Sequence, residues 1–133
     1  MAMLVPLIFL LILEFGLRIF GEGYPVHFFV RRTDAPGYFT NLKFGWRFFP
    51  PSIARWPSPQ NLPPHKGPNT YRLFILGSSA AYGTPSDYYN FGRVLQAMLE
   101  QRFSGIRFEV INAAMTAINS HVVLPIARDC AAL

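Results

Sequence analysis

The sequence predicts an α/β fold that follows an apolar N-terminal helix. Three observations support this prediction: an apolar N-terminal run, a proline-rich segment after it, and then a strand, a helix and a second strand in succession. A strand, a crossover helix and a second strand form a right-handed βαβ unit with parallel strands. We therefore divide the chain into a helix (1–21), a connector (22–70) and the beginning of an α/β domain (71–133).

Residues 1–21 are predicted to form a transmembrane helix. The run is uncharged up to Leu13, and apolar side chains continue to Phe20, which is about the length that crosses the hydrocarbon of a bilayer. Glu14 and Arg18 interrupt it, but they lie four residues apart on one helical face and can pair. No basic segment precedes the run and no small-x-small site follows it, which favours an uncleaved signal anchor over a signal peptide or a buried helix.

Composition and charge limit the possible partners. The hydrophobic fraction of 51% with only 14% charged residues is typical of a membrane-associated chain. The net charge of +5 comes from scattered basic residues, so we expect no nucleic-acid partner. The single cysteine, Cys130, excludes an internal disulfide, and no histidines stand at ligand spacing. We therefore expect no metal site and no cofactor.

Residues 22–70 are predicted to be an extended connector. Its many prolines each remove a backbone donor and restrict the residue before them, which excludes a long helix or a central strand. The segment is nevertheless too aromatic for a flexible linker. We expect its rings to pack on the domain or to lie at a membrane interface, and the alternative that they line a substrate pocket stays open.

The first strand of the α/β domain ends at a candidate nucleophile. Residues 71–76 form a short apolar run that stops at Gly77, and a bend of small residues follows. The bend lacks the Gly-Lys-Ser/Thr of a P-loop and the closely spaced glycines of a dinucleotide fingerprint. Position 81 is alanine, where the nucleophile elbow of α/β-hydrolases needs glycine. A Gly-x-Ser-x-x-x-Gly pattern remains, with Ser79 as its serine.

A helix and a second strand follow this bend. Apolar residues recur at intervals of three and four and predict one buried stripe: Phe91, Val94, Leu95, Met98, Leu99 and Phe103. Residues 107–112 are strand-like, and Ser120 is placed to begin a last helix that contains Pro125 near its first turns. Because the carboxyl ends of parallel strands meet at one edge, we expect Ser79 and Asn112 to lie near each other.

The residues at these two strand ends resemble a known family. Gly-Ser-Ser-Ala-Ala-Tyr-Gly at 77–83 and Asn-Ala-Ala-Met-Thr-Ala-Ile-Asn-Ser at 112–120 resemble the first two blocks of the SGNH, or GDSL, hydrolases, in particular a membrane-anchored and often bacterial subgroup. The resemblance covers residues 71–133. It implies a three-layer α/β/α, flavodoxin-like SGNH hydrolase fold, of which this chain holds only the first part.

The same resemblance implies an activity and its residues. The chain resembles serine hydrolases and acyltransferases that act on ester bonds of a small molecule, a glycan or a lipid. Ser79 would be the nucleophile, and the backbone N–H groups of Ser79 and Ala114 would hold the oxyanion, although Ala114 stands where the family has glycine. Gly77 and Asn112 would belong to the same binding site.

A base for the serine is missing from these blocks. A serine nucleophile needs a base and at least two oxyanion donors. His27 and His65 lie in the connector, and His121 lies eight residues before Asp129, which places the two about 12 Å apart along a helix and excludes a relay. In the family the remaining asparagine and an Asp-x-x-His pair come from later blocks, so we expect the chain by itself to be inactive as an esterase.

The expected location follows from the charges and from the resemblance. Basic residues follow the N-terminal helix and none precedes it, which by the positive-inside rule would keep the remainder in the cytoplasm. The resemblance implies the opposite side, and we expect a single-pass membrane protein with an extracytoplasmic hydrolase part. The alternative is a non-catalytic, membrane-anchored interaction module whose aromatic connector and incomplete sheet bind a partner.

Overall fold

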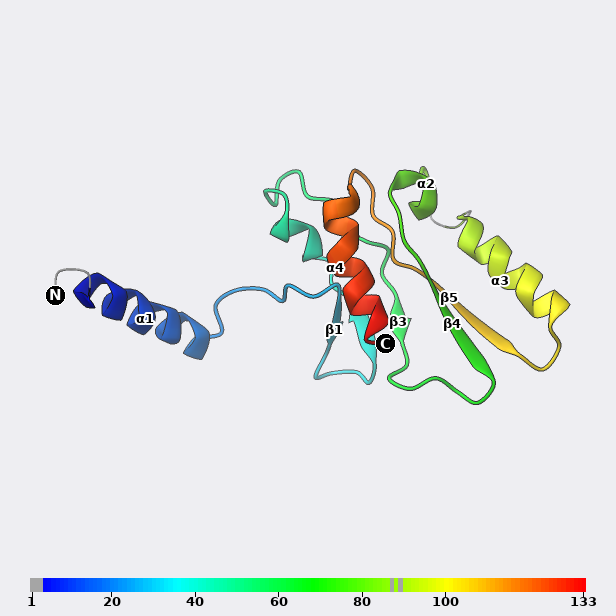
Figure 1. Ribbon diagram of the computed structural model, residues 1–133, viewed down its shortest axis with the longest axis horizontal. Helices are drawn as coiled ribbons and strands as arrows, with labels where there is room; N and C mark the ends of the chain where they lie inside the picture. The colour runs from blue at the N-terminus through cyan, green and yellow to red at the C-terminus, as the bar shows by residue number, and fades with distance from the viewer. Residues whose placement is uncertain (1–3, 87, 89) are drawn as a thin grey trace.

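The computed structural model describes residues 4–86, 88 and 90–133 (Figure 1). Within these residues the chain folds into a small mixed α/β structure with four α-helices and two small sheets. The elements, in order, are α1 (Leu4–Ile19), β1 (Phe29–Arg31), β2 (Tyr38–Thr40), the 3₁₀ helix η1 (Phe44–Arg47), β3 (Asn61–Leu62), β4 (Thr70–Ile75), α2 (Ser79–Tyr82), α3 (Phe91–Arg102), β5 (Arg107–Asn112) and α4 (Ser120–Ala131).

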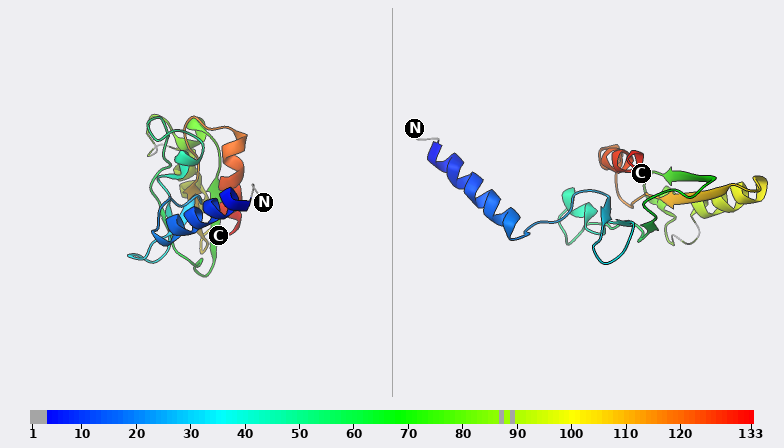
Figure 2. Two further views of the ribbon diagram at one scale, coloured as in Figure 1. Left: turned by 90° about the vertical axis from the view of Figure 1, so that its left-hand side faces the viewer. Right: turned by 90° about the horizontal axis from the view of Figure 1, so that it is seen from below.

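The helix α1 stands away from the other elements, and none of its residues is buried (Figures 1 and 2). The expected pair is present, with Arg18 Nε donating to Glu14 Oε1 at 2.7 Å. The helix ends at Ile19, and its 16 described residues rise about 24 Å, whereas bilayer hydrocarbon is about 30 Å thick.

No helix in the described part of the chain is long and apolar enough to cross a membrane. The prediction of a transmembrane signal anchor over 1–21 is therefore wrong, and with it the predicted single-pass membrane location. Residues 1–3 of that prediction lie outside the described residues.

The connector is not simply extended but contains its own antiparallel sheet. The strands lie in the order β1-β2-β3, with Val30 opposite Phe39 and Tyr38 opposite Leu62. All the prolines of the connector lie outside these short strands, where no ladder hydrogen bond is lost. Aromatic rings of the connector form part of the main core, as Phe28 and Phe44 meet edge to face with centroids 5.1 Å apart. Phe28 and Phe44 therefore pack on the rest of the domain, as was expected for rings of the connector.

The second sheet is the expected parallel pair of β4 and β5, joined by α3. Leu73 lies opposite Val110, and Ile75 lies opposite Asn112. The predicted three-layer, flavodoxin-like SGNH fold is nevertheless wrong for this structure, because the described strands form two separate sheets and not one doubly covered parallel sheet. The separation lies between β3 and β5, where the side chain of Gln60, and not a backbone ladder, bonds to the carbonyl of Asn112 at 2.7 Å.

Helices cover the two faces of the parallel pair unequally. One face, with Phe74 and Ile111, packs on the main core that α4 supplies with Val122 and Ile126. On the other face α3 approaches closely at Gly92, where an added Cβ would lie 2.4 Å from Ile75 Cδ1. The stripe of α3 was predicted to be buried, but Phe91, Val94, Met98 and Phe103 are exposed. The sheet formed by β4 and β5 is too narrow to cover the whole apolar stripe of α3.

Candidate functional site

The parallel pair brings the two predicted loops to one edge. Ser79 is the first residue of α2, directly beyond the carboxyl end of β4, and it is exposed. Its carbonyl accepts hydrogen bonds from the backbone N–H groups of Gly83 at 3.1 Å and of Thr84 at 3.2 Å. The loop after β5 lies against this turn, because Met115 N–H donates to the carbonyl of Gly77 at 3.3 Å. We call this edge, from Gly77 to Gly83 and from Asn112 to Met115, the rim.

Two glycines allow the rim turn to be this tight. A Cβ on Gly77 would lie 2.6 Å from the Cβ of Ala81, so a side chain there would collide with α2. Gly83 ends α2 in the left-handed region with a φ of 96°, and a Cβ there would lie 2.7 Å from that of Asn90. Both glycines of the Gly-x-Ser-x-x-x-Gly pattern are therefore required by space and by backbone conformation.

Asn112 joins the two loops through its buried carboxamide. Its Nδ2 donates to the carbonyls of Ala81 at 2.9 Å and Tyr82 at 3.2 Å, and its Oδ1 accepts from Ala114 N–H at 3.1 Å. Every polar atom of the side chain thus has a partner. A buried amide that bridges two loops fixes their separation, because any shift would leave a polar group unsatisfied.

The two expected oxyanion donors differ in their availability. Ala114 is fully buried, and its N–H is already engaged by Asn112 Oδ1. It would have to give up that bond before it could serve an oxyanion. Ser79 N–H, by contrast, donates to no acceptor among the described residues. The oxyanion role of Ala114 stays a prediction, whereas Asn112 is a positioning residue of the rim in this structure.

No histidine among the described residues forms a hydrogen bond with Ser79. His121 lies in the first turn of α4, exposed, with its ring edge-on to Phe48 at a centroid distance of 6.0 Å. The cavity beside it, about 540 Å³, is lined by Arg47, Phe48 and Asn119 among others. The structure therefore places aromatic side chains of the connector and His121 together, but it brings neither to the Ser79 hydroxyl.

Asp129 has a partner that sequence reasoning missed. Its Oδ1 lies 3.0 Å from His27 Nδ1, and its Oδ2 accepts from the backbone N–H of Phe28 at 2.6 Å. The carboxylate thus fastens the connector to α4 across more than one hundred positions of sequence. Spacing along a helix excluded His121 as the partner, but no local pattern could have indicated His27.

A buried ion pair links β4 to β5. Arg72 Nη2 lies 2.9 Å from Glu109 Oε2, and the arginine side chain is only 1% exposed. The same guanidinium donates to the carbonyls of Pro63 at 3.1 Å and Leu133 at 3.4 Å. The only sequence signal was a charged residue inside each apolar strand, and the register that makes them neighbours appears only in the fold.

Among the described residues, displaced pKa values occur at Cys130 and in the Arg32–Asp34 pair. Burial raises the pKa of the Cys130 thiol to about 12, and the nearby Asp129 carboxylate adds to this effect. The hydrogen bond from the exposed Arg32 guanidinium lowers the pKa of Asp34. Neither group lies at the rim, so the displaced values mark a buried core thiol and a surface pair and not a catalytic centre.

Comparison of the chain with protein-family models, with curated proteins and with solved structures finds no match in any of the three. Function is therefore inferred from the residues and the geometry of the rim.

Proposed function

We propose that the rim is the nucleophile-bearing edge of an SGNH-type serine hydrolase that acts on ester bonds of a small molecule, a glycan or a lipid. The observation that supports it is the exposed Ser79 at the carboxyl end of β4, tied to the loop after β5 by the buried Asn112. Open parallel sheets bind ligands at this edge. The family resemblance of the two rim segments adds the chemistry.

The proposed reaction begins when Ser79 Oγ attacks the acyl carbon of the ester. The hydroxyl proton passes to a base, and the carbonyl oxygen gains the negative charge of a tetrahedral intermediate. Ser79 N–H is free within the described residues to stabilise that charge, while Ala114 N–H is held by Asn112. Since no described histidine bonds to Ser79, the base is the missing component, and the chain alone should turn over esters no faster than its Ser79→Ala variant.

Chemical rescue tests the proposal directly. Imidazole in solution replaces the missing base, and a fluorophosphonate probe reports nucleophilic serines by a covalent adduct that mass spectrometry assigns to one peptide. We expect an imidazole-dependent adduct on Ser79, no adduct there in Ser79→Ala, and no adduct on Ser120, an exposed serine at the start of α4. Equal labelling of Ser79 and Ser120, or no labelling at all with imidazole present, would contradict the proposal.

A second candidate function is a non-catalytic interaction module. The observation that favours it is the commitment of Ala114 N–H to Asn112 together with the lack of any histidine bonded to Ser79 in the described part of the chain. In that case the small residues of the rim only turn the chain. The rescue experiment separates the two candidates, because in a non-catalytic module the probe would label Ser79 no more than other exposed serines.

A further inference from the structure

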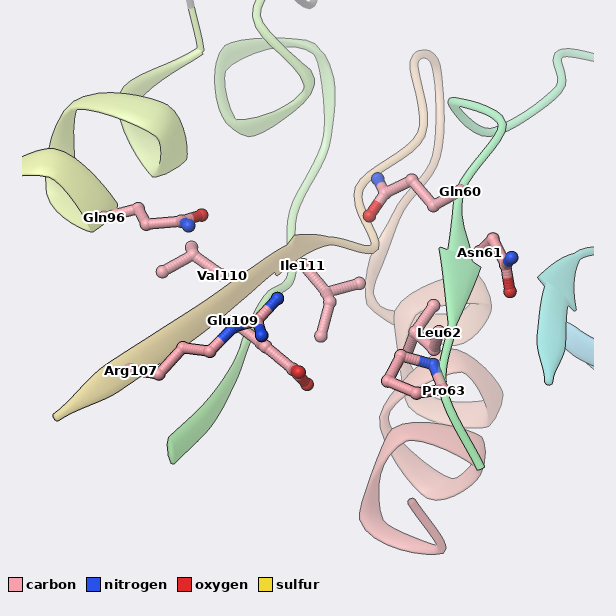
Figure 3. Close-up of a pocket in the computed structure, with 9 residues that line it drawn as sticks. All are labelled: Gln60, Asn61, Leu62, Pro63, Gln96, Arg107, Glu109, Val110 and Ile111. Atoms are coloured by element: carbon pink, nitrogen blue, oxygen red, sulfur yellow. The ribbon is translucent and has the colours of Figure 1, made fainter. Parts of the chain in front are cut away.

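Two open strand edges face each other across a cavity between the sheets. The cavity has a volume of about 340 Å³. Residues 60–63, in and next to β3, form one wall, residues 107 and 109–111 of β5 form the other, and Gln96 of α3 lies beside the second wall (Figure 3). We call this cavity the slot.

The hydrogen bonds of β5 show which of its peptide groups point away from β4. The N–H groups of Arg107 and Ala113 donate to carbonyls of the β4 segment at 3.0 and 2.9 Å. Backbone groups of successive strand residues point to opposite sides, so Phe108 and Val110 direct theirs away from β4. Within the described residues these outward groups have no backbone partner.

The edge of β3 is open in the same way. Thr40 N–H donates to the carbonyl of Gln60 at 3.1 Å, and Leu62 lies opposite Tyr38 in the same ladder. By the same alternation the peptide groups of Asn61, between Gln60 and Leu62, point away from β2 and towards β5. Within the part of the chain that the structure describes, the slot therefore has main-chain donors and acceptors without a backbone partner on both walls.

At one end of the slot, the side-chain amide of Gln60 already occupies the position that a peptide group of an added strand would take. Gln60 Nε2 donates to the carbonyl of Asn112 at 2.7 Å, and Asn112 is the next outward-facing residue of β5 after Val110. A carboxamide has the same donor and acceptor groups as a peptide unit. From that bond the two strands diverge (Figure 3), so the open part of the slot continues the row of hydrogen-bonding groups that Gln60 begins.

Side chains add a charge preference to this geometry. Leu62 and Ile111, which line the slot, also belong to the main apolar core. The carboxylate of Glu109 is held by Arg72, whereas the exposed Arg107 has no ion-pair partner among the described residues. The unbalanced charge at the slot is therefore positive, and it favours an acidic group on whatever enters.

We propose that the slot binds an extended peptide with apolar side chains and one acidic side chain. Its main chain pairs with Phe108 and Val110 on one wall and with Asn61 on the other, and the acidic side chain lies near Arg107. Recognition of this kind derives its affinity from main-chain hydrogen bonds to strand edges. The proposal does not depend on the reaction proposed for Ser79.

Amide hydrogen exchange of the full chain with one probe peptide tests it. The probe is acetyl-Thr-Val-Thr-Val-Asp-amide, and its matched control carries N-methyl groups on alternate peptide nitrogens, with the same side chains. We expect the probe to protect the amides of Asn61, Phe108 and Val110 from exchange in a saturable way. The N-methylated control should bind with an affinity at least about tenfold lower. Equal binding of the two peptides, or protection confined to α1, overturns the proposal.

The charge preference has its own pair of variants. Arg107→Gln is expected to weaken binding of the probe about threefold at low salt, as exposed ion pairs do. Arg102→Gln, an equal change of charge at the end of α3 and away from the slot, is the matched control and should leave binding unchanged. If both variants weaken binding equally, the acidic side chain is held by net charge and not by Arg107, and that part of the proposal is overturned.

Discussion

Arg72 and Glu109 are opposite residues of the two parallel strands, and their side chains form the most deeply buried ion pair of the described structure, with Nη2 and Oε2 2.9 Å apart. Their interaction connects β4 to β5 on the face that α4 covers. The pair also extends to the connector and to the last residue, through the carbonyls of Pro63 and Leu133. The Arg72 guanidinium thus joins β4 to three other parts of the chain: β5, the connector and the last residue.

Removing Glu109 should therefore destabilise the fold strongly. Glu109→Ala leaves the Arg72 charge buried without a counterion, and we expect the free energy of unfolding to fall by about 3 kcal/mol. Urea unfolding followed by circular dichroism measures it. The double variant Arg72→Met with Glu109→Leu removes both charges and should lose less than Glu109→Ala. A double variant at least as unstable as the single one would show that the charge left behind is not the cause.

Replacing Asn112 should separate the two loops of the rim. Asn112→Ala removes three hydrogen bonds of a buried amide, and the loss of stability should be about 2 to 3 kcal/mol. Thermal unfolding is the measurement. The control is Asn61→Ala, because Asn61 is exposed; Asn69 is unsuitable, since its positive φ would add backbone strain in an alanine variant. Asn61→Ala should lower the free energy of unfolding much less than Asn112→Ala. Similar losses for Asn112→Ala and Asn61→Ala would argue against the bridging role.

The contact between Gly77 and Ala81 predicts a coupled pair of substitutions. Gly77→Ala places a methyl group 2.6 Å from the Cβ of Ala81, so it should destabilise the rim. Ala81→Gly removes the opposing methyl group and should recover part of that loss. A double-mutant cycle of unfolding free energies should give a coupling of about 1 kcal/mol, because the residues are in direct contact. Additive effects would mean that the strain at Gly77 has another source.

Cys130 predicts a pH dependence on the alkaline side. The pKa of its thiol is raised from 9.0 to about 12 in the folded chain, so the unfolded chain loses its proton first as the pH rises. The stabilising contribution is complete below the unfolded pKa and is lost as the pH approaches the folded one. Between neutral pH and about pH 10, the free energy of unfolding should fall in both proteins. The fall should be about 1 kcal/mol larger in the wild type than in Cys130→Ala. Parallel pH profiles of the two proteins would refute this.

The elements of the second half of the chain were accessible from sequence because their signals are local. The apolar run before Gly77, the periodicity after Asn90 and the strand-like run at 107–112 predicted β4, α3 and β5 and their parallel pairing. The rim glycines were visible as well, since a tight turn can be recognised from residue type. The prediction of a transmembrane helix was wrong because it rested on the whole apolar run from Met1 to Phe20, whereas the described helix covers only Leu4–Ile19 and is too short to cross a membrane.

By itself, then, the sequence determined the βαβ unit and the position of Ser79 at the end of a strand, because backbone periodicity and turn chemistry act over a few residues. Only the tertiary structure decided which distant residues meet: His27 with Asp129, Arg72 with Glu109, and Gln60 with the edge of β5. It also decided that the connector forms a sheet of its own. These pairings depend on burial and on register across the whole chain, and such long-range contacts leave no periodic signal in the residues that make them.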